Sequence, residues 1–437
     1  MQEGLLGSAG KRIAIAAGLA TLGPALSAVS LTQLPKDLLE RLMRYVEFFD
    51  RPAGPNIQAT LESLAQIEFS DFDERIKILT PLTMDFELLA AHKTLAAQTK
   101  DLREQVRQRE TLQSLTANRC LILNFLGIDF RRFQQRAAAS VGEVLDEVIS
   151  QTVGSCAALS ESDLDDDDFT QLSERLNGSY VGIKLYPALG YDVWPADEAH
   201  RSIHVSLIQE LALRGLPVTV HCQEGSFTAG PEFGSKKKLI DNAKPTKWEQ
   251  LLERSGEAAM QLRLNLAHFG GEEGVAEVVE FSSADHRNRG AGSRRKKFFK
   301  RLDLRRGSWT TPVIRMLKRY SNTYSDLGAF DFEDDQAAAA LLWILHEDAT
   351  GELDSLGPHK LRDKLMWGTD IPMTLFHHES YKDQFDTFVK RTSKQGFSSR
   401  EAKRWELPPS DSPAMSDHEG LLEDLVNRNP RRFLFGG

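Results

Sequence analysis

Cysteine is scarce in this sequence, and its scarcity excludes one way of stabilising a fold. The chain has 437 residues and 3 cysteines, and Cys120, Cys156 and Cys222 lie far apart along it. Such spacing offers neither a disulfide framework nor a cysteine-based zinc site. We therefore expect a protein of a reducing compartment, and we place it in the cytoplasm.

Long apolar runs are missing as well. No stretch approaches the roughly 18 consecutive apolar residues that a membrane-spanning helix needs, so we expect no membrane span. The stretch 11–28 leaves export open, because Lys11 and Arg12 precede an apolar run that ends in small residues. That is the layout of a secretory signal, and a buried apolar helix is the alternative reading.

The chain also lacks an excess of positive charge. Its formal net charge is -9, which argues against binding of nucleic acid by the whole surface. One strongly basic run includes Arg294 to Lys297. That run could meet an acidic partner, but a solvated loop is the simpler reading. We do not expect nucleic acid to be a partner.

What the sequence does contain is a series of short apolar runs separated by helix-length stretches. Each gap is long enough for a crossover helix and a loop, as a repeating βα unit requires. The runs lie at 75–85, 120–129, 180–187, 216–222, 264–271, 323–328 and 364–372. This pattern predicts the α/β class and a (β/α)8 TIM-like barrel, with its active site at the carboxyl ends of the strands.

The chain divides into two parts on this reading. Residues 1–70 form an N-terminal helical segment, with apolar residues at helical spacing, and residues 71–437 form the barrel. Two stretches of the barrel read as insertions at the surface. One is basic, at about 283–307, and the other is polar and proline-containing, at about 394–420.

Side chains that suit a metal site stand where several strands are predicted to end. His221 and His268 close apolar runs, and Asp370 follows the last one. Neutral imidazole and carboxylate are ligands for zinc or another first-row divalent ion. A bound ion would activate a water molecule, and Asp370 is placed to take its proton. We expect one divalent ion, zinc, with manganese or iron as alternatives.

Structural readings stand beside these functional ones. Asp326 could serve only to cap the turn that follows it, and Tyr186 could simply pack against Pro187. His200 and His204 lie four residues apart on a predicted helix, a spacing that can bind metal. An exposed helix face is the simpler reading for that pair.

An ordered set of motifs resembles one known family. The chain contains Gly182-Ile-Lys-Leu-Tyr-Pro187, Val220-His-Cys222, Leu266-Ala-His-Phe-Gly270, Tyr324-Ser-Asp-Leu-Gly328 and Trp367-Gly-Thr-Asp-Ile-Pro372. Together they resemble strands four to eight of the amidohydrolase superfamily, in its amidohydrolase-related branch of metal-dependent hydrolases and decarboxylases. The closing Asn427-Arg-Asn-Pro-Arg-Arg-Phe-Leu434 resembles the end of that branch. The resemblance covers roughly residues 71–435.

The resemblance implies roles for individual residues. His221 would be the metal ligand of strand five, and Asp370 would be the ligand and general base of strand eight. His268 would be a ligand or a group that contacts substrate and water, and so a catalytic residue. Lys184 would be a carboxylated bridging lysine or a cationic substrate contact. The candidates for supporting or substrate-pocket positions are Tyr186, Glu224 and Asp326.

One family feature is missing. The first strand of the family ends in His-x-His, which supplies two metal ligands, and this sequence has no such motif. Its only histidine before residue 200 is His92, in a predicted helix. Either the N-terminus is truncated, or the first strand is rebuilt from something like Arg12–Ala17 without ligands. A barrel without this strand would also expose strand edges, a possible site of pairing between copies.

Three functions follow from these observations. The preferred one is a metal-dependent hydrolase of a C–N or C–O bond in a small molecule, and a metal-dependent decarboxylase is one alternative. The other alternative is a degenerate barrel that acts as a binding or scaffold protein, which the missing His-x-His favours.

Overall fold

The computed structural model shows a mixed α/β protein built on parallel strands. It describes residues 62, 78–82, 121–136, 139–164, 169–176, 179–224, 228–229, 233–279, 308–370, 374, 378–409, 412 and 416–436. The strands are β1 (Ile78–Leu79), β2 (Leu121–Ile122), β3 (Asn124–Gly127), β4 (Tyr180–Leu185), β5 (Val218–Gln223), β6 (Leu264–Gly270), β7 (Thr323–Asp326) and β8 (Leu365–Met366).

The strands pair in the order of the sequence. A six-stranded parallel sheet runs from β3 to β8, and β1 pairs with β2. An isolated parallel bridge between Leu82 and Phe125 continues the β1 segment alongside β3. Sequential parallel neighbours require a crossover between every pair of strands, which brings all carboxyl ends to one edge. In the described part of the chain, no pairing joins β8 to β1, so a closed barrel is not shown.

The central strands are buried on both faces. Every residue of β4 and of β6 is buried, as expected for a parallel sheet covered on both sides. Gly182 allows the close approach of β4 to β3. A Cβ at this position would lie 2.3 Å from Cε1 of Phe125, so that ring occupies the space that a side chain would need.

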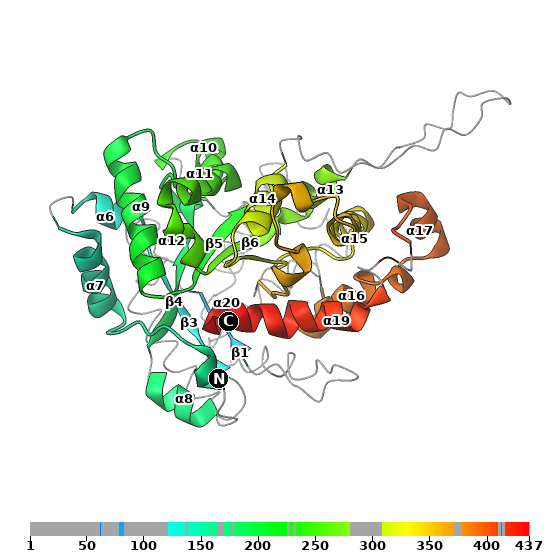
Figure 1. Cartoon of the computed structure of the whole chain (residues 1–437), viewed down its shortest axis with the longest axis horizontal. Coiled ribbons are helices and arrows are strands. Elements are labelled where there is room, and N and C mark those ends of the chain that lie inside the picture. The colour runs from blue at the N-terminus through cyan, green and yellow to red at the C-terminus, as the bar shows by residue number, and fades with distance from the viewer. Residues whose placement is uncertain are drawn as a thin grey trace, which may run out of the picture.

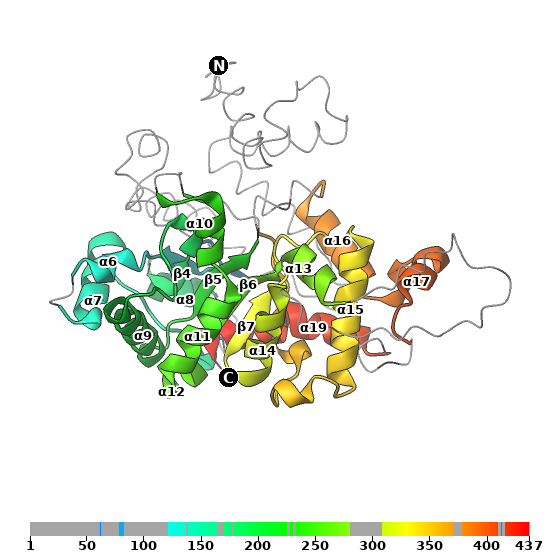
Figure 2. The ribbon, with the colours of Figure 1, turned by 90° about the horizontal axis from the view of Figure 1, so that it is seen from above.

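Helices cover the outer side of the sheet (Figures 1 and 2). Neighbouring helices along this layer contact one another, as α7 does with α9, α9 with α11, and α11 with α14. The main helices are α6 (Arg131–Gln134), α7 (Val141–Thr152), α8 (Phe169–Leu176), α9 (Glu198–Leu213), α10 (Lys236–Asn242), α11 (Pro245–Ser255), α12 (Glu257–Gln261), α13 (Gly271–Val278), α14 (Thr310–Arg319), α15 (Asp335–Ala349), α16 (Tyr381–Arg391), α17 (Ser399–Trp405), α19 (His418–Glu423) and α20 (Asn429–Phe435).

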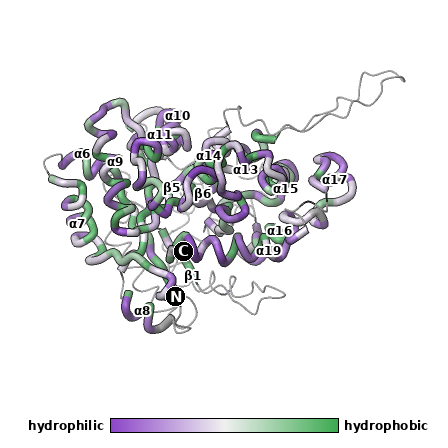
Figure 3. Tube along the Cα trace, viewed as in Figure 1, coloured by the Kyte–Doolittle hydropathy of each residue, from purple (hydrophilic) through white to green (hydrophobic). Residues whose placement is uncertain are grey.

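Two apolar cores lie on the two sides of the strands. The larger one fills the space between the sheet and its helices. The smaller one lies on the inner side, where Phe433 of α20 packs against Phe125 of β3 and Tyr324 of β7 at centroid distances of 6.1 and 5.9 Å. Hydrophobic segments gather at the strands, whereas α17 is largely hydrophilic (Figure 3). The C-terminal helix thus fills one end of the strand assembly.

Several sequence expectations meet the structure here. The α/β class and the parallel order of strands are confirmed. The polar stretch 394–420, expected as a surface insertion, contains α17, and Trp405 and Leu407 pack against Ala338 and Leu342 of α15. Most of the segment 1–70, with the signal-like stretch 11–28, lies outside the described residues, as does the basic insertion.

No helix in the described part of the chain is both long enough and apolar enough to cross a membrane.

Candidate metal and catalytic site

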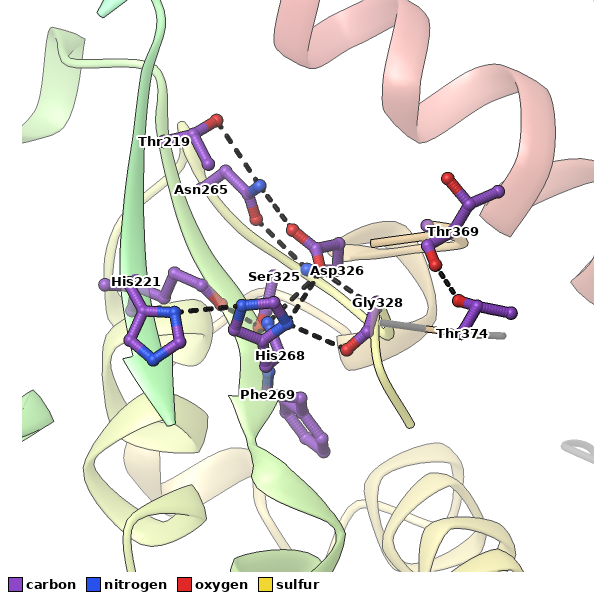
Figure 4. Close-up of polar contacts among 12 residues, drawn as sticks. Thr219, His221, Asn265, His268, Phe269, Ser325, Asp326, Gly328, Thr369 and Thr374 are labelled. Carbon is purple, nitrogen blue, oxygen red and sulfur yellow. Dashed lines mark hydrogen bonds and ion pairs between the residues drawn. The ribbon is translucent and has the colours of Figure 1, made fainter. Parts of the chain in front are cut away.

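Two histidines face each other at the carboxyl ends of adjacent strands (Figure 4). His221 lies in β5 and His268 in β6, and Nδ1 of His221 is 3.1 Å from Nε2 of His268. Both side chains are buried, with 7% and 6% of their surface exposed. Sequence reasoning placed both residues at strand ends, and the structure brings their rings into contact.

A backbone carbonyl orients the ring of His268. Nδ1 of His268 lies 2.8 Å from the carbonyl oxygen of Gly328, which can only accept a hydrogen bond. His268 therefore donates from Nδ1, and its Nε2 faces Nδ1 of His221. A histidine held by a carbonyl through one nitrogen presents the other in a fixed direction, which is how metal-binding histidines are commonly oriented.

The backbone at His268 is strained. His268 and Phe269 have φ values of 73° and 50°, a left-handed conformation that non-glycine residues rarely adopt. Asp370 shows the same feature, with φ at 46°. Each of these residues stands at or just beyond the carboxyl end of β6 or β8. Strain of this kind persists where the surroundings hold it, and it is found most often at functional sites.

Side chains of β7 hold the strained segment in place. The backbone N–H of His268 donates to Oδ1 of Asp326 at 3.2 Å, and that of Phe269 donates to Oγ of Ser325 at 3.1 Å. The ladder between β6 and β7 is confined to Leu264 with Thr323 and Asn265 with Tyr324. The side chains of Ser325 and Asp326 thus replace the backbone pairing beyond that point.

Asn265 completes this support, and sequence reasoning missed both it and Ser325. Its Nδ2 donates to Oδ2 of Asp326 at 2.6 Å, and its Oδ1 accepts from the backbone N–H of Asp326 at 3.0 Å. Asp326 also caps its own turn, since the N–H of Gly328 donates to it at 2.9 Å. The sequence feature that could have identified Asn265 and Ser325 is the presence of polar residues within otherwise apolar strands.

Lys184 and Tyr186 of the β4 end lie beside His221. The ring of Tyr186 stacks on the imidazole at a centroid distance of 4.4 Å and an angle of 23°. Nζ of Lys184 lies 5.7 Å from the centroid of the same tyrosine, within the range of a cation–π contact. The stack fixes the plane of the His221 ring.

Asp370 approaches the pair from the β8 side, and Gly328 leaves room for it. A Cβ at Gly328 would lie 2.8 Å from Oδ1 of Asp326, 3.4 Å from Cβ of Asp370 and 3.6 Å from Nδ1 of His268. Asp326, Asp370 and His268 therefore converge around this glycine. Glu224 is exposed directly after β5 and lies outside the group of contacting side chains.

Burial sets the charge state of the site. It holds the pKa of His221 well below its usual value, and the nearby His268 and Lys184 act in the same direction. Burial also lowers the pKa of Lys184 to about 8, although Asp326 and Asp370 oppose the shift. The pKa of the Cys222 thiol is raised by burial, so this cysteine stays protonated and is unsuited as a nucleophile. His221 is thus a neutral imidazole, the form that binds metals.

The histidine pair fits a divalent ion, but its ligand set is partial. Two nitrogens that each lie about 2.0–2.1 Å from one tetrahedral zinc ion stand roughly 3.3 Å apart, close to the separation found here. Among the described residues, however, no group of three His, Cys, Asp or Glu side chains is placed to hold a metal ion. Asp370 would have to turn toward the pair to supply a third ligand.

The second histidine pair is structural. His204 on α9 is fully buried, and its Nδ1 donates to the carbonyl oxygen of Val193 at 2.9 Å. Its Nε2 lies 2.9 Å from Nε2 of Gln134. His200 lies near the N-terminus of the same helix and is partly exposed. The expectation of an exposed helix face was therefore wrong for His204, because the ring fills a polar niche in the core.

Comparisons with known proteins add little to this geometry. No protein-family model matches the sequence, and no curated protein matches it either. A crystal structure of an amidohydrolase from Burkholderia multivorans with bound zinc is similar, with a TM-score of 0.28 and 15% identity. The match covers 76% of this chain and 100% of that one. A likeness of this extent leaves the function to be argued from the site itself.

Proposed function

We propose that this protein is a metal-dependent hydrolase of a C–N or C–O bond in a small molecule. The observation that carries the proposal is the contact between Nδ1 of His221 and Nε2 of His268, 3.1 Å apart at the carboxyl ends of adjacent strands. That is where α/β folds place their chemistry, because the loops that follow the strands converge there.

The donor set points to a first-row divalent ion. His221 and His268 would supply two neutral imidazoles, and Asp370 would supply a carboxylate after a rotation of its side chain. Zinc suits such a set best, with manganese and iron as alternatives. When bound, such an ion lowers the pKa of a coordinated water and polarises a substrate carbonyl.

The surrounding residues would orient the reaction and move its proton. Asp370 would take the proton of the attacking water and return it to the leaving nitrogen or oxygen. Gly328 and Asp326 keep His268 in its orientation through its Nδ1–H and its backbone N–H. Tyr186 keeps the His221 ring in its plane by stacking.

A binding protein of the same fold is the second candidate. It is favoured by one observation, the lack of a third ligand near the histidine pair in the described part of the chain. On this reading the two histidines keep the hydrogen bond that they form with each other. The strained backbone and the buried imidazoles would then shape a ligand pocket without a metal.

Metal binding separates the two candidates. Protein purified without chelators, and then incubated with zinc and dialysed, should retain about one zinc ion per chain by elemental analysis. His221→Ala should lose it, whereas His204→Gln should keep it, because the ring of His204 bonds Val193 and Gln134 and neither histidine of the pair. A panel of amides, esters and lactones would then be tested for hydrolysis. Absence of zinc from the unaltered protein after incubation would overturn the hydrolase proposal.

A further inference from the structure

Two side chains hold the backbone just before Asp370. The carbonyl oxygen of Gly368 accepts a hydrogen bond from Nε2 of Gln384 at 3.3 Å. The carbonyl oxygen of Thr369 accepts one from the hydroxyl of Thr374 (Figure 4). Two consecutive carbonyls, immediately N-terminal to the candidate metal ligand, are therefore fixed by side chains.

Both donors are buried and are themselves held in place. Gln384 and Thr374 each expose 1% of their surface, so both are shielded from water. Gln384 lies near the N-terminus of α16, where Phe385 packs against the ring of Trp367 at a centroid distance of 5.1 Å. The backbone N–H of His378 donates to the carbonyl oxygen of Thr374 at 2.9 Å. Helix α16 is thus joined closely to the segment that follows β8.

The backbone of Asp370 needs support of this kind. Its φ of 46° lies in the left-handed region, where a side chain crowds the following carbonyl, so the conformation persists only if its neighbours hold it. The preceding Gly368 packs closely on the β7 side, since a Cβ at this position would lie 3.4 Å from N and from Cα of Gly328. The carbonyl of Gly328 in turn holds the ring of His268. The position of Asp370 relative to the histidine pair thus depends on the two residues that precede it.

We propose that Gln384 and Thr374 are positioning residues, which hold Asp370 in its left-handed conformation so that a rotation of its side chain brings the carboxylate to the histidine pair. The inference rests on the proposed function for the role of Asp370 as metal ligand and general base. Both residues act through the backbone. Thr374 bonds the carbonyl next to Asp370, and Gln384 anchors the one before it to α16.

Variants that lack one donor each test this role. Thr374→Val and Gln384→Met keep the approximate size of their side chains but cannot donate to the carbonyls before Asp370. In crystal structures of the chelator-treated proteins, we expect Asp370 to leave the left-handed region in each variant and to keep it in the unaltered protein. Thr374→Ser retains a hydroxyl at the same position, so it should retain the conformation as well.

Zinc affinity, measured by isothermal titration calorimetry, is the functional readout. Each of the two variants should weaken zinc binding at least about fivefold, equivalent to about 1 kcal/mol, whereas Thr374→Ser should bind zinc like the unaltered protein. Gln384→Met should change the midpoint of urea unfolding little. Oε1 of Gln384 has no donor among the described residues, so methionine removes that unsatisfied acceptor along with the hydrogen bond. Lost zinc affinity without lost stability separates positioning from a purely structural role.

Thr392→Val is the matched control at the end of α16. Thr392 also exposes 1% of its surface, and its hydroxyl donates to the carbonyl oxygen of Phe388 at 2.9 Å. Loss of this hydroxyl should lower the stability of the protein. It should leave both the backbone of Asp370 and the zinc affinity unchanged.

The crystal structures separate this inference from the hydrolase proposal. If the unaltered protein binds no zinc, the hydrolase is rejected, but a left-handed Asp370 that is lost in the variants still supports the positioning role. If zinc binds, unchanged affinity in both variants would overturn that role and leave the hydrolase. A left-handed Asp370 in both variants would overturn it whatever the metal content. If Thr374→Val does not fold, Gln384→Met decides.

Discussion

At the scale of single residues, His268 depends on side chains of the neighbouring strand. Its φ of 73° takes its N–H out of the regular ladder, and the carboxylate of Asp326 accepts that N–H. Asp326 is in turn held by both polar atoms of the Asn265 side chain. The direction of the His268 ring thus rests on a hydrogen-bonded pair formed between β6 and β7.

Exchanging the side chains of Asn265 and Asp326 tests whether this pair holds His268 in its orientation. Asp326→Asn places an amide N–H₂ among N–H donors, so we expect the free energy of unfolding to fall by about 1–3 kcal/mol. Asn265→Asp sets two carboxylates against each other and should be at least as harmful. The double variant Asn265→Asp/Asp326→Asn restores a carboxylate opposite an amide, and should recover at least about 1 kcal/mol in a double-mutant cycle.

Urea unfolding of the four proteins provides these free energies, and zinc affinity provides a second readout. The double variant should bind zinc more tightly than either single variant, because His268 returns to its orientation. Strictly additive losses in both quantities would show that the pair does not act as a unit.

The sequence alone located the histidines but not this support. His221 and His268 end apolar runs, so position along the chain was enough to propose them. Asn265 and Ser325 act through the register between β6 and β7, which brings together residues about 60 apart in the chain. Glu224 also follows a strand, but its side chain is exposed. A position after a strand therefore does not determine whether a side chain points into the site.

At the scale of elements, helix α9 contains a buried histidine, His204, whose protonated form is disfavoured in the folded protein. Burial lowers the pKa of His204 from 6.5 to about 4. Between these two values the unfolded chain binds a proton that the folded protein does not. Folding stability should therefore fall as the pH falls from about 6.5 toward 4, by a total of roughly 3 kcal/mol from this residue.

The variant His204→Gln measures this contribution. Glutamine has no titratable group, so the stability of this variant should depend less on pH between about 6.5 and 4 than that of the unaltered protein. Parallel stability curves for His204→Gln and the unaltered protein would contradict the assignment.

The strands were the elements that the sequence predicted best. Their buried apolar runs are local signals, and all seven predicted runs contain a strand or a pair of strands. The helix α17 was hidden by its composition, because Arg400, Lys403 and Arg404 are exposed while Trp405 packs on α15. Helix periodicity in so short and polar a segment is weak, and tertiary contacts decided its structure.

At the scale of the whole molecule, the C-terminal segment shields one edge of the sheet. The backbone N–H of Trp367, just beyond β8, donates to the carbonyl oxygen of Leu425 at 2.8 Å. Nδ2 of Asn429 donates to the carbonyl oxygen of Leu365 at 2.7 Å. Pro430 has no N–H to offer the preceding turn, which leaves carbonyls such as that of Leu425 available. In the described part of the chain, these two hydrogen bonds satisfy backbone groups along the outer edge of β8.

The same segment fills the inner core, so its removal should affect the whole molecule. Phe433 is buried between Phe125 of β3 and Tyr324 of β7, strands that are not adjacent in the sheet. We expect Phe433→Ala to lower the free energy of unfolding by about 3–5 kcal/mol, the usual range for a buried phenylalanine. Arg432→Ala, at the exposed neighbouring position, should change it by less than about 0.5 kcal/mol. Urea unfolding measures both values. A small loss for Phe433→Ala would mean that the strands hold their inner side together without the C-terminal helix.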